Sequence, residues 1–343
     1  MTPPSPLRRT TPGRASGPAS GHSAGFLSGR MAGVLPGLVL GLALGLATTA
    51  PALADTLTYV IPFPAGGESD VTARLQEPVL KAVSGKDVVI QYKAGAGGAA
   101  AWASLNKMPA DGSTVMGTNL PHIFLQPMEK NVGYKTEDLV HVAIFQLTPD
   151  AIVVPADSPY KTLADLIAAA KKTPGAITMS GSGTNTGPHL SHTTFDKLAG
   201  IKTTYVPFAG TAPSVVAMLG KQVNAAMTFT TAAIQQGDKV RMLAVALEKR
   251  LETHPNVPTF KELGFDMVSG VYRGVAVPAA TPEAQRKALS GWFAKVNRDP
   301  AYRKKMVDAG YVVVDVDYEK APAFLAAKRK EYEAAARAVG LLK

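Results

Sequence analysis

The sequence contains no cysteine among its 343 residues. Disulfide bonds, thiolate nucleophiles and thiolate metal sites are therefore excluded. A lipid-modified cysteine is excluded as well, so we expect the exported chain to be free rather than anchored to a membrane by lipid. Charged residues make up only 18% and hydrophobic residues 46% of the sequence. These proportions predict a globular chain and not a disordered one.

Acidic residues are absent from the first 54 positions, which contain four arginines, Arg8, Arg9, Arg14 and Arg30. An apolar run, VLPGLVLGLALGL, follows at 34–46, and small residues end at Ala52-x-Ala54. This order is typical of a secretory signal peptide, and the run is too short to span a bilayer comfortably. We expect cleavage after Ala54 and a periplasmic protein. Either translation starts nearer Met31, or the two adjacent arginines belong to a twin-arginine signal.

Basic residues exceed acidic ones only mildly in the expected mature chain. Without residues 1–54, 32 basic and 26 acidic residues remain, a net charge of +6. Such an excess can attract anions to a cleft but selects none of them. Lysine and arginine form no blocks interleaved with aromatic residues, so no nucleic-acid partner is expected.

From residue 57 onward, short β-type runs alternate with helical periodicity. This alternation predicts an α/β protein with parallel strands covered by helices. We expect Ser69 to cap the first helix and Pro78 to kink or shorten it. Pro282 and Pro300 are expected at the first position of two later helices. The predicted strands occupy 57–63, 87–92, 113–118, 176–181 and 203–208, followed by NAAMTF and VRMLAVAL.

Two extended apolar segments, 151–159 and 272–282, each end at a proline. If each crosses once between two lobes, residues 55–150 and 275–343 form the first lobe and residues 151–274 the second. Two crossover strands make a hinge, and the cleft between hinged lobes is a common ligand site.

The junctions between strands and helices are rich in Gly, Ser, Thr and Asn. In PFPAGGESD (62–70), Gly66 and Gly67 let the backbone approach a ligand, and the new helix directs free N–H groups at it. This junction therefore predicts an anion site. Asp70 belongs either to the ligand shell or to the first turn, where it stabilises the helix dipole.

Further junctions carry the same chemistry. GTNLPH (117–122) contains Thr118 and Asn119, SGSGTNTGPH (180–189) places hydroxyl and amide groups before a helix, and VPFAGTAPS (206–214) repeats the pattern. Neutral donors beside a helix N-terminus suit a carboxylate. KAGAGGAAA (93–101) is similar to a dinucleotide fingerprint, but it follows the second strand of its unit, and no cofactor is expected.

The arrangements that carry catalysis are missing: there is no Gly-x-Ser-x-Gly elbow, Walker loop or His-Glu-x-x-His motif. We therefore expect a binding protein and not an enzyme. His189, His192 and Asp196 share a helical face and could ligate a metal. The alternative is a capping or surface role for both histidines, and no metal site is predicted.

The ordered motifs FPAGGESDVTARL, KAGAGGAAA, PADG, SPYKTLADL, GSGTNTGPHL, VPFAGTAPSV and VPTFKELGF resemble the substrate-binding receptors of tripartite tricarboxylate transporters, also called Bug receptors. The resemblance runs from about residue 57 to the C-terminus. It implies a two-lobed type II periplasmic-binding-protein fold, with integral-membrane permease subunits as partners. It also implies a ligand carboxylate held by backbone amides, often through ordered water. We expect a monomer. The positions that match the family's ligand loops are Phe63, Ala65, Gly66, Gly67, Ser69 and Asp70, then Gly183, Thr184, Asn185, Thr186 and His189, then Phe208, Gly210 and Thr211.

The chain departs from its relatives at two places. After Phe229, where many relatives have Asp-Asn, this sequence has Thr230-Thr231. Before the returning strand, where many have two aromatic residues, it has Tyr272-Arg273. Arg273 could clamp a second carboxylate, since a guanidinium forks onto one. The alternative is a surface or lobe-bridging arginine. We expect a small carboxylate as ligand, delivered to a transporter or, alternatively, reported to a two-component system.

Overall fold

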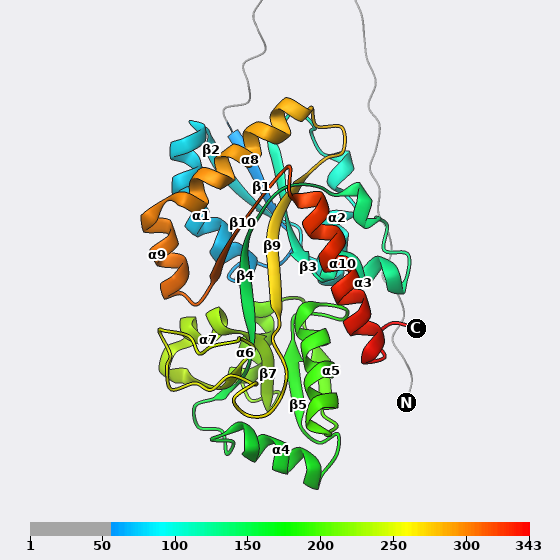
Figure 1. Cartoon of the computed structure of the whole chain (residues 1–343), viewed down its shortest axis with the longest axis vertical. Helices are drawn as coiled ribbons and strands as arrows, with labels where there is room; N and C mark the ends of the chain where they lie inside the picture. Colours follow the sequence, from blue (N-terminus) through cyan, green and yellow to red (C-terminus); the bar gives the residue numbers. More distant parts are fainter. Residues whose placement is uncertain (1–55) are drawn as a thin grey trace, which may run out of the picture. The chain divides into compact units, whose positions relative to one another are not determined.

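The computed structural model describes residues 56–343 (Figure 1). The predicted signal peptide, residues 1–54, lies outside the described residues. Within the described part, no helix combines the length and the apolar composition that a membrane crossing requires.

Strands and helices alternate along the chain, as the sequence predicts (Figure 1). The strands are β1 (Thr56–Ile61), β2 (Asp87–Tyr92), β3 (Thr114–Leu120), β4 (Val140–Pro155), β5 (Thr178–Gly181), β6 (Thr204–Pro207), β7 (Ala225–Phe229), β8 (Val240–Val245), β9 (Gly270–Val277) and β10 (Val312–Asp317). The helices are α1 (Glu68–Ser84), α2 (Ala99–Trp102), α3 (His122–Glu129), α4 (Leu163–Lys172), α5 (Gly187–Ala199), α6 (Thr211–Leu219), α7 (Thr230–Gln236), α8 (Glu283–Arg298), α9 (Pro300–Asp308) and α10 (Ala321–Ala338).

The long strand β4 joins two groups of strands. Its first part pairs with β9 and β10, and its last part pairs with β7 and β8. We call the part of the chain built on β1, β2, β3 and β10 the first lobe, and the part built on β5 to β8 the second lobe. Figure 1 shows β4 and β9 running side by side between them.

The expectation of parallel strands is correct only for part of the sheet. β1 is parallel to β2 and β3, and β5 is parallel to β6 and β7. β9, in contrast, is antiparallel to both β3 and β4. The physical reason is the crossover itself: the chain leaves the first lobe along β4 and comes back along β9, so the two strands run in opposite directions.

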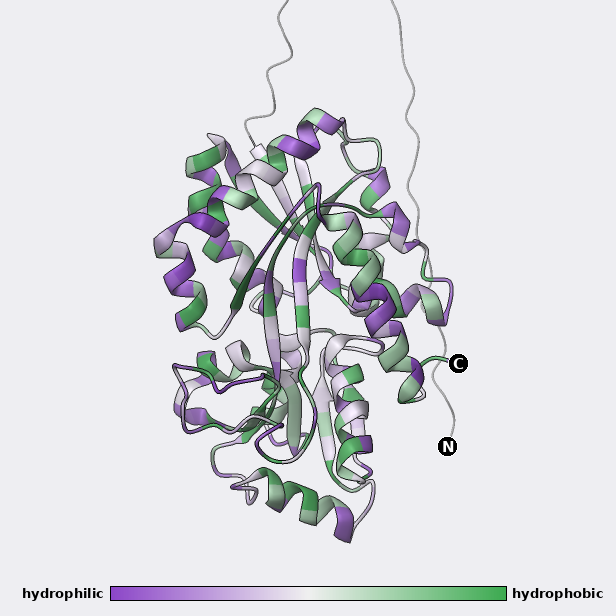
Figure 2. Ribbon diagram, in the orientation of Figure 1, coloured by the Kyte–Doolittle hydropathy of each residue, from purple (hydrophilic) through white to green (hydrophobic). Residues whose placement is uncertain are grey.

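Each lobe has its own apolar core, and purple and green residues alternate along the helices (Figure 2). The first core contains Trp102, Tyr59 and Phe293, all buried. The second contains Phe195 and Phe260, with a neighbouring cluster around Phe229. Strand β4 contributes residues to the cores of both lobes and so connects the two lobes through its packing. The lobe boundaries at residues 150 and 275 stay a prediction.

Helix α1 differs from the sequence prediction in two ways. Its N-cap is Gly67 and not Ser69, because the Gly67 carbonyl already accepts from the amides of Asp70 and Val71. The helix also continues through Pro78 to Ser84 without being shortened. Pro78 lies on the exposed side, where the carbonyl that loses its hydrogen bond can bind water.

The other helix starts follow the sequence closely. Thr162 and Asp165 form a capping box at the start of α4, and Asp299 caps α9 with Pro300 at its first position. Pro282, in contrast, is the N-cap of α8 and lies one residue before the helix. Helix α6 begins at Thr211, and Gly210 is its N-cap.

Candidate functional site

A small cavity lies where the two lobes meet. Its volume is about 10 Å³, close to the minimum that one water molecule needs. The lobes are therefore closed on each other, and a larger molecule reaches this cavity only when they separate. The cavity is lined by Phe63, Glu68, Ser69, Asn119, His122, Ser182, Thr211, Phe229 and Arg273.

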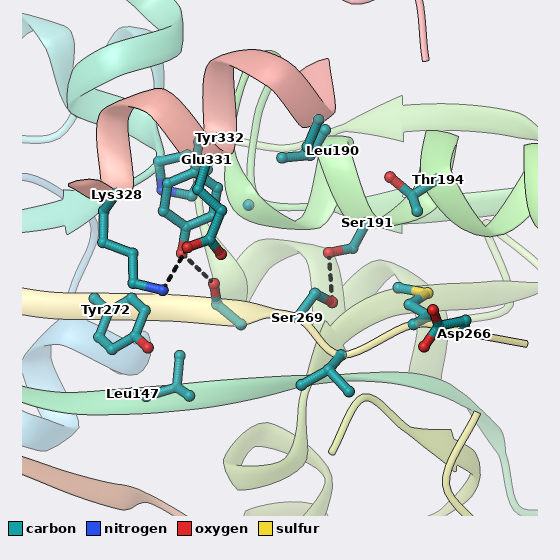
Figure 3. Close-up of a pocket in the computed structure, with 16 residues that line it drawn as sticks. Leu147, Leu190, Ser191, Thr194, Asp266, Ser269, Tyr272, Lys328, Glu331 and Tyr332 are labelled. Carbon is teal, nitrogen blue, oxygen red and sulfur yellow. Dashed lines mark hydrogen bonds and ion pairs between the residues drawn. The ribbon is translucent and has the colours of Figure 1, made fainter. Parts of the chain in front are cut away.

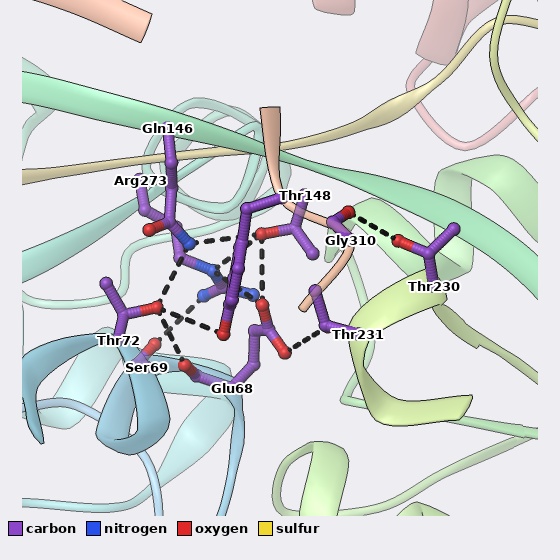
Figure 4. Close-up of polar contacts among 10 residues, drawn as sticks. Glu68, Ser69, Thr72, Gln146, Thr148, Thr230, Thr231, Arg273 and Gly310 are labelled. Carbon is purple, nitrogen blue, oxygen red and sulfur yellow. Dashed lines mark hydrogen bonds and ion pairs between the residues drawn. The ribbon is translucent and has the colours of Figure 1, made fainter. Parts of the chain in front are cut away.

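Arg273, on β9, lies at the centre of this site and is 3% exposed (Figure 4). Its Nη1 donates to Ser69 Oγ at 2.9 Å, and its Nε donates to Thr148 Oγ1 at 3.3 Å. The guanidinium carbon also lies 5.1 Å from the centre of the Phe229 ring, within the range of a cation–π contact. Burial lowers the pKa of Arg273, whereas the charge of Glu68 raises it.

Glu68, in the first turn of α1, is the acidic partner of Arg273. Its Oε1 lies 3.9 Å from Arg273 Nε and accepts a hydrogen bond from Thr148 at 3.1 Å. Its Oε2 accepts from Thr231 Oγ1, in the second lobe, at 2.6 Å. Figure 4 shows the carboxylate between Thr148, Thr231 and Arg273. A buried charge is tolerated when it is paired and hydrogen-bonded in this way.

Two lining side chains hold polar atoms that have no protein partner. His122 Nδ1 and Ser182 Oγ are both buried and unpaired. Burial, followed by the charge of Arg273, holds the pKa of His122 well below its ordinary value of 6.5, so the imidazole is neutral. Buried polar atoms without partners are rare in folded proteins. One of these atoms comes from each lobe, which is what a ligand held between the lobes requires.

The structure brings six of the predicted site residues to the cavity wall, namely Phe63, Ser69, Asn119, Thr211, Phe229 and Arg273. Two lining residues, Glu68 and His122, were missed, and a third, Ser182, was predicted only as one of the hydroxyl donors ahead of α5. All three belong to junctions that the sequence singles out, and their position there was the available signal. An anion site gave no reason to expect Glu68, because a carboxylate repels an anion unless a cation is next to it.

The rest of the first predicted loop surrounds the cavity without lining it. Ala65 and Gly66 are exposed, and Gly67 packs close to the backbone of α6. Asp70 points into its own loop: Oδ2 accepts from the Gly66 amide at 2.7 Å, and Oδ1 accepts from Tyr92 at the same distance. The alternative in which Asp70 stabilises its own helix start is therefore the one that its contacts support.

Gly183, Thr186 and Asn185 hold the second predicted loop together and do not line the cavity. Thr186 caps α5, and its hydroxyl donates to the Gly183 carbonyl at 2.8 Å. The side chain of Asn185 donates across to Glu129 of the first lobe. Thr184 is exposed.

Four further predicted residues, Thr118, Phe208, Gly210 and Thr230, are not among those that line the cavity. Thr118 is buried beside Asn119 on β3. Phe208 is half-buried and donates its amide to Gly181, and Gly210 packs on Phe63. Thr230 donates to the Gly310 carbonyl at 3.0 Å, a further contact between the lobes.

The histidines of α5 have partners within their own lobe. His189 stacks on Tyr205, with ring centres 4.5 Å apart, and its Nδ1 accepts from the Asn185 amide. His192 Nε2 lies 2.6 Å from Thr203 Oγ1, which also contacts Asp196. Burial lowers the pKa of both histidines to about 4. In residues 56–343, no group of three His, Cys, Asp or Glu side chains is placed to hold a metal ion.

A larger pocket of about 230 Å³ lies between α5, α10 and the start of β9 (Figure 3). Lys328 forms an ion pair with Glu331 at 2.7 Å and lies over the Tyr272 ring at 4.9 Å. The hydroxyl oxygens of Ser191 and Ser269 lie 2.9 Å apart. Among its described lining residues, none has a buried polar atom without a partner. The inter-lobe cavity is therefore the better candidate for the ligand site, although it is smaller.

A buried arginine, unpaired polar atoms and helix starts between two closed lobes define a solute-binding protein. A family model described as "Tripartite tricarboxylate transporter family receptor" matches residues 72–341. A Cupriavidus necator relative, "UPF0065 protein in gbd 5'region", is 30% identical over 286 residues, 83% of this chain and 87% of that protein. "Protein BugT" of Bordetella pertussis is 31% identical over 243 residues, 68% of this chain and 74% of that protein.

Solved structures show the same fold. The periplasmic binding protein BugD superposes with a TM-score of 0.79 at 26% identity, covering 84% of this chain and 98% of that one. An R. palustris protein solved with adipate has a TM-score of 0.79 at 25% identity, covering 83% of this chain and 97% of that one. The chain belongs to the tripartite tricarboxylate transporter receptor family and has the periplasmic-binding-protein fold expected from its motifs. This family consists of solute-binding receptors.

Proposed function

We propose that this receptor captures a small organic acid in the inter-lobe cavity and delivers it to the integral-membrane permease of a tripartite tricarboxylate-type transporter. The proposal includes export to the periplasm by the predicted signal peptide, action as a monomer, and binding without chemical turnover. The family match and the adipate in one structural neighbour support it.

The observation that carries the proposal is the position of Arg273. Its guanidinium is buried in the cavity wall, and hydrogen bonds to Ser69 and Thr148 fix its orientation. A guanidinium has five N–H donors, so donors remain for a ligand carboxylate. The first turns of α1 and α6 reach the same cavity through Ser69 and Thr211, and helix N-termini favour anions.

Native mass spectrometry of freshly purified protein, followed by a thermal-shift panel, tests ligand capture. The panel holds mono-, di- and tricarboxylates, aromatic acids, a neutral sugar and an amine. We expect at least one carboxylate to raise the melting temperature, because a ligand that binds only the folded state stabilises it. Arg273→Ala should abolish that rise. The carboxylate proposal is wrong if only the sugar or the amine stabilises the protein.

Deletion of the neighbouring permease genes tests delivery. Uptake of the bound acid should fall to the level of a receptor deletion. Unchanged uptake, with loss of an acid-induced transcriptional response in the receptor deletion, would instead show the alternative sensory role.

A further inference from the structure

The cavity wall carries one cation and one anion. Arg273 and Glu68 are the charged residues among its described lining residues, and His122 is neutral. The charges of the two side chains cancel to a first approximation, since they lie 3.9 Å apart. A ligand that enters this wall therefore meets a balanced pair of charges and not an excess of positive charge.

The Glu68 carboxylate cannot swing out of the way at small cost. Thr148 and Thr231 donate to its two oxygens at 3.1 and 2.6 Å. Gln146 donates to Thr148 at 3.2 Å and to Thr72 at 3.0 Å, so the surrounding hydroxyls are themselves held in place. The Glu68 side chain is 5% exposed and belongs to the first turn of a 17-residue helix. It is a fixed part of the site whenever the lobes are closed.

These charges discriminate between ligands of different charge. One ligand carboxylate can accept hydrogen bonds from the N–H groups of Arg273 that do not donate to Ser69 or Thr148. A second carboxylate on a ligand held between the lobes at this wall would lie near Glu68, and two like charges out of water repel strongly. A hydrogen-bond donor in that position would instead find the carboxylate of Glu68 and the uncharged polar atoms of His122 and Ser182.

We propose that Glu68, paired with Arg273, selects acids that carry one carboxylate and a hydrogen-bond donor, an ammonium group above all, over dicarboxylates. This inference rests on the proposed function, because it presumes that the cavity binds a carboxylate at all. It also assigns the Arg273 guanidinium to a single ligand carboxylate and not to the clamping of a second one.

A series of matched ligands tests the selection. The straight-chain dicarboxylates from malonate to adipate are each paired with the amino acid in which an ammonium group replaces one carboxylate, from glycine to 5-aminopentanoate. Isothermal titration calorimetry gives the affinity ratio within each pair. We expect the amino acid to bind more tightly in the pair of best-fitting length, by roughly 30-fold or more, as for a buried charge pair.

Glu68→Gln should reverse this ratio, because it keeps the size and the hydrogen-bonding capacity of the side chain and removes its charge. Glu77→Gln on the same helix controls for net charge and should leave the ratio unchanged. Thr231→Val removes the bond to the second lobe without changing any charge, so it should weaken both ligands of a pair alike. Thermal unfolding of each variant shows whether it is folded.

A dicarboxylate that binds the unaltered protein more tightly than its partner overturns the proposal, and so does a ratio that Glu68→Gln leaves in place. Binding of other monocarboxylates without any member of the series also overturns it. If no carboxylate of any kind binds, the proposed function itself has failed, which is a different result.

Discussion

The hydroxyl of Thr231 on α7 donates a 2.6 Å hydrogen bond to the carboxylate of Glu68 on α1, and this bond joins the second lobe to the first. A hydrogen bond to a charged group contributes about 1.5–3 kcal/mol. We expect Thr231→Val to lower the free energy of unfolding by about this amount, measured by urea denaturation. Thr231→Ser keeps the hydroxyl and should lose much less. Equal losses in the two variants would show that the bond contributes nothing.

Asp150 gives the stability of the protein a specific pH dependence. Burial raises the pKa of its carboxyl from 3.8 to about 6, although hydrogen bonds from Ser191 and Ser269 lower it. Between about pH 4 and 6, Asp150 is therefore protonated in the folded state but ionised in the unfolded state. The resulting stabilisation is fully present below about pH 4 and is lost as the pH rises through about 6.

The variant Asp150→Asn isolates this effect, because the amide does not titrate. Relative to the variant, the unaltered protein should gain on the order of 3 kcal/mol as the pH falls from 7 to 4. Urea denaturation of both proteins across this range measures the difference. Parallel stability curves would mean that Asp150 does not titrate in this window.

Gly187, the first residue of α5, lies against the strand that returns between the lobes. A Cβ atom added there would lie 2.3 Å from Val271 Cγ2, which is shorter than any real contact. We expect Gly187→Ala to destabilise the protein by about 1–3 kcal/mol through overpacking. Gly291→Ala is the matched control: its Cβ would meet nothing within 4 Å, and alanine favours helix α8. A Gly187→Ala protein as stable as this control would contradict the packing.

Trp102 supports the cavity wall from behind. Its Nε1 donates to the Gly117 carbonyl at 2.9 Å, and its ring meets Phe63 edge-on at 6.4 Å. Trp102→Phe should cost about 2–4 kcal/mol, because it leaves a buried carbonyl unpaired and a void. It should also abolish the change in tryptophan fluorescence on ligand binding. Trp292→Phe, at a half-buried position on α8, should keep that change. If the fluorescence change is lost in Trp292→Phe but kept in Trp102→Phe, the change comes from Trp292 and the prediction for Trp102 is wrong.

The sequence alone determined the order of strands and helices and the position of the glycine-rich junction loops, because these follow from local periodicity, capping residues and glycines. Phe63, Ser69 and Arg273, which the sequence predicts as ligand-binding residues, line one cavity in the structure, and their contact with a ligand stays a prediction. The antiparallel course of β4 and β9 did not follow from local patterns, since strand direction is set by how the chain returns between lobes.

Only the tertiary structure decided what Arg273 contacts. Arg273 and Glu68 are 205 residues apart in the sequence, and Thr231 is 163 residues from Glu68, so no spacing pattern could pair them. Their meeting depends on the closure of two lobes that fold around separate cores. The sequence shows that a side chain is charged, but whether that side chain is solvated or buried depends on the residues that surround it in the folded protein. In this receptor, Glu68 makes a site predicted for anions nearly neutral, because it lies beside the cation that was expected to bind them.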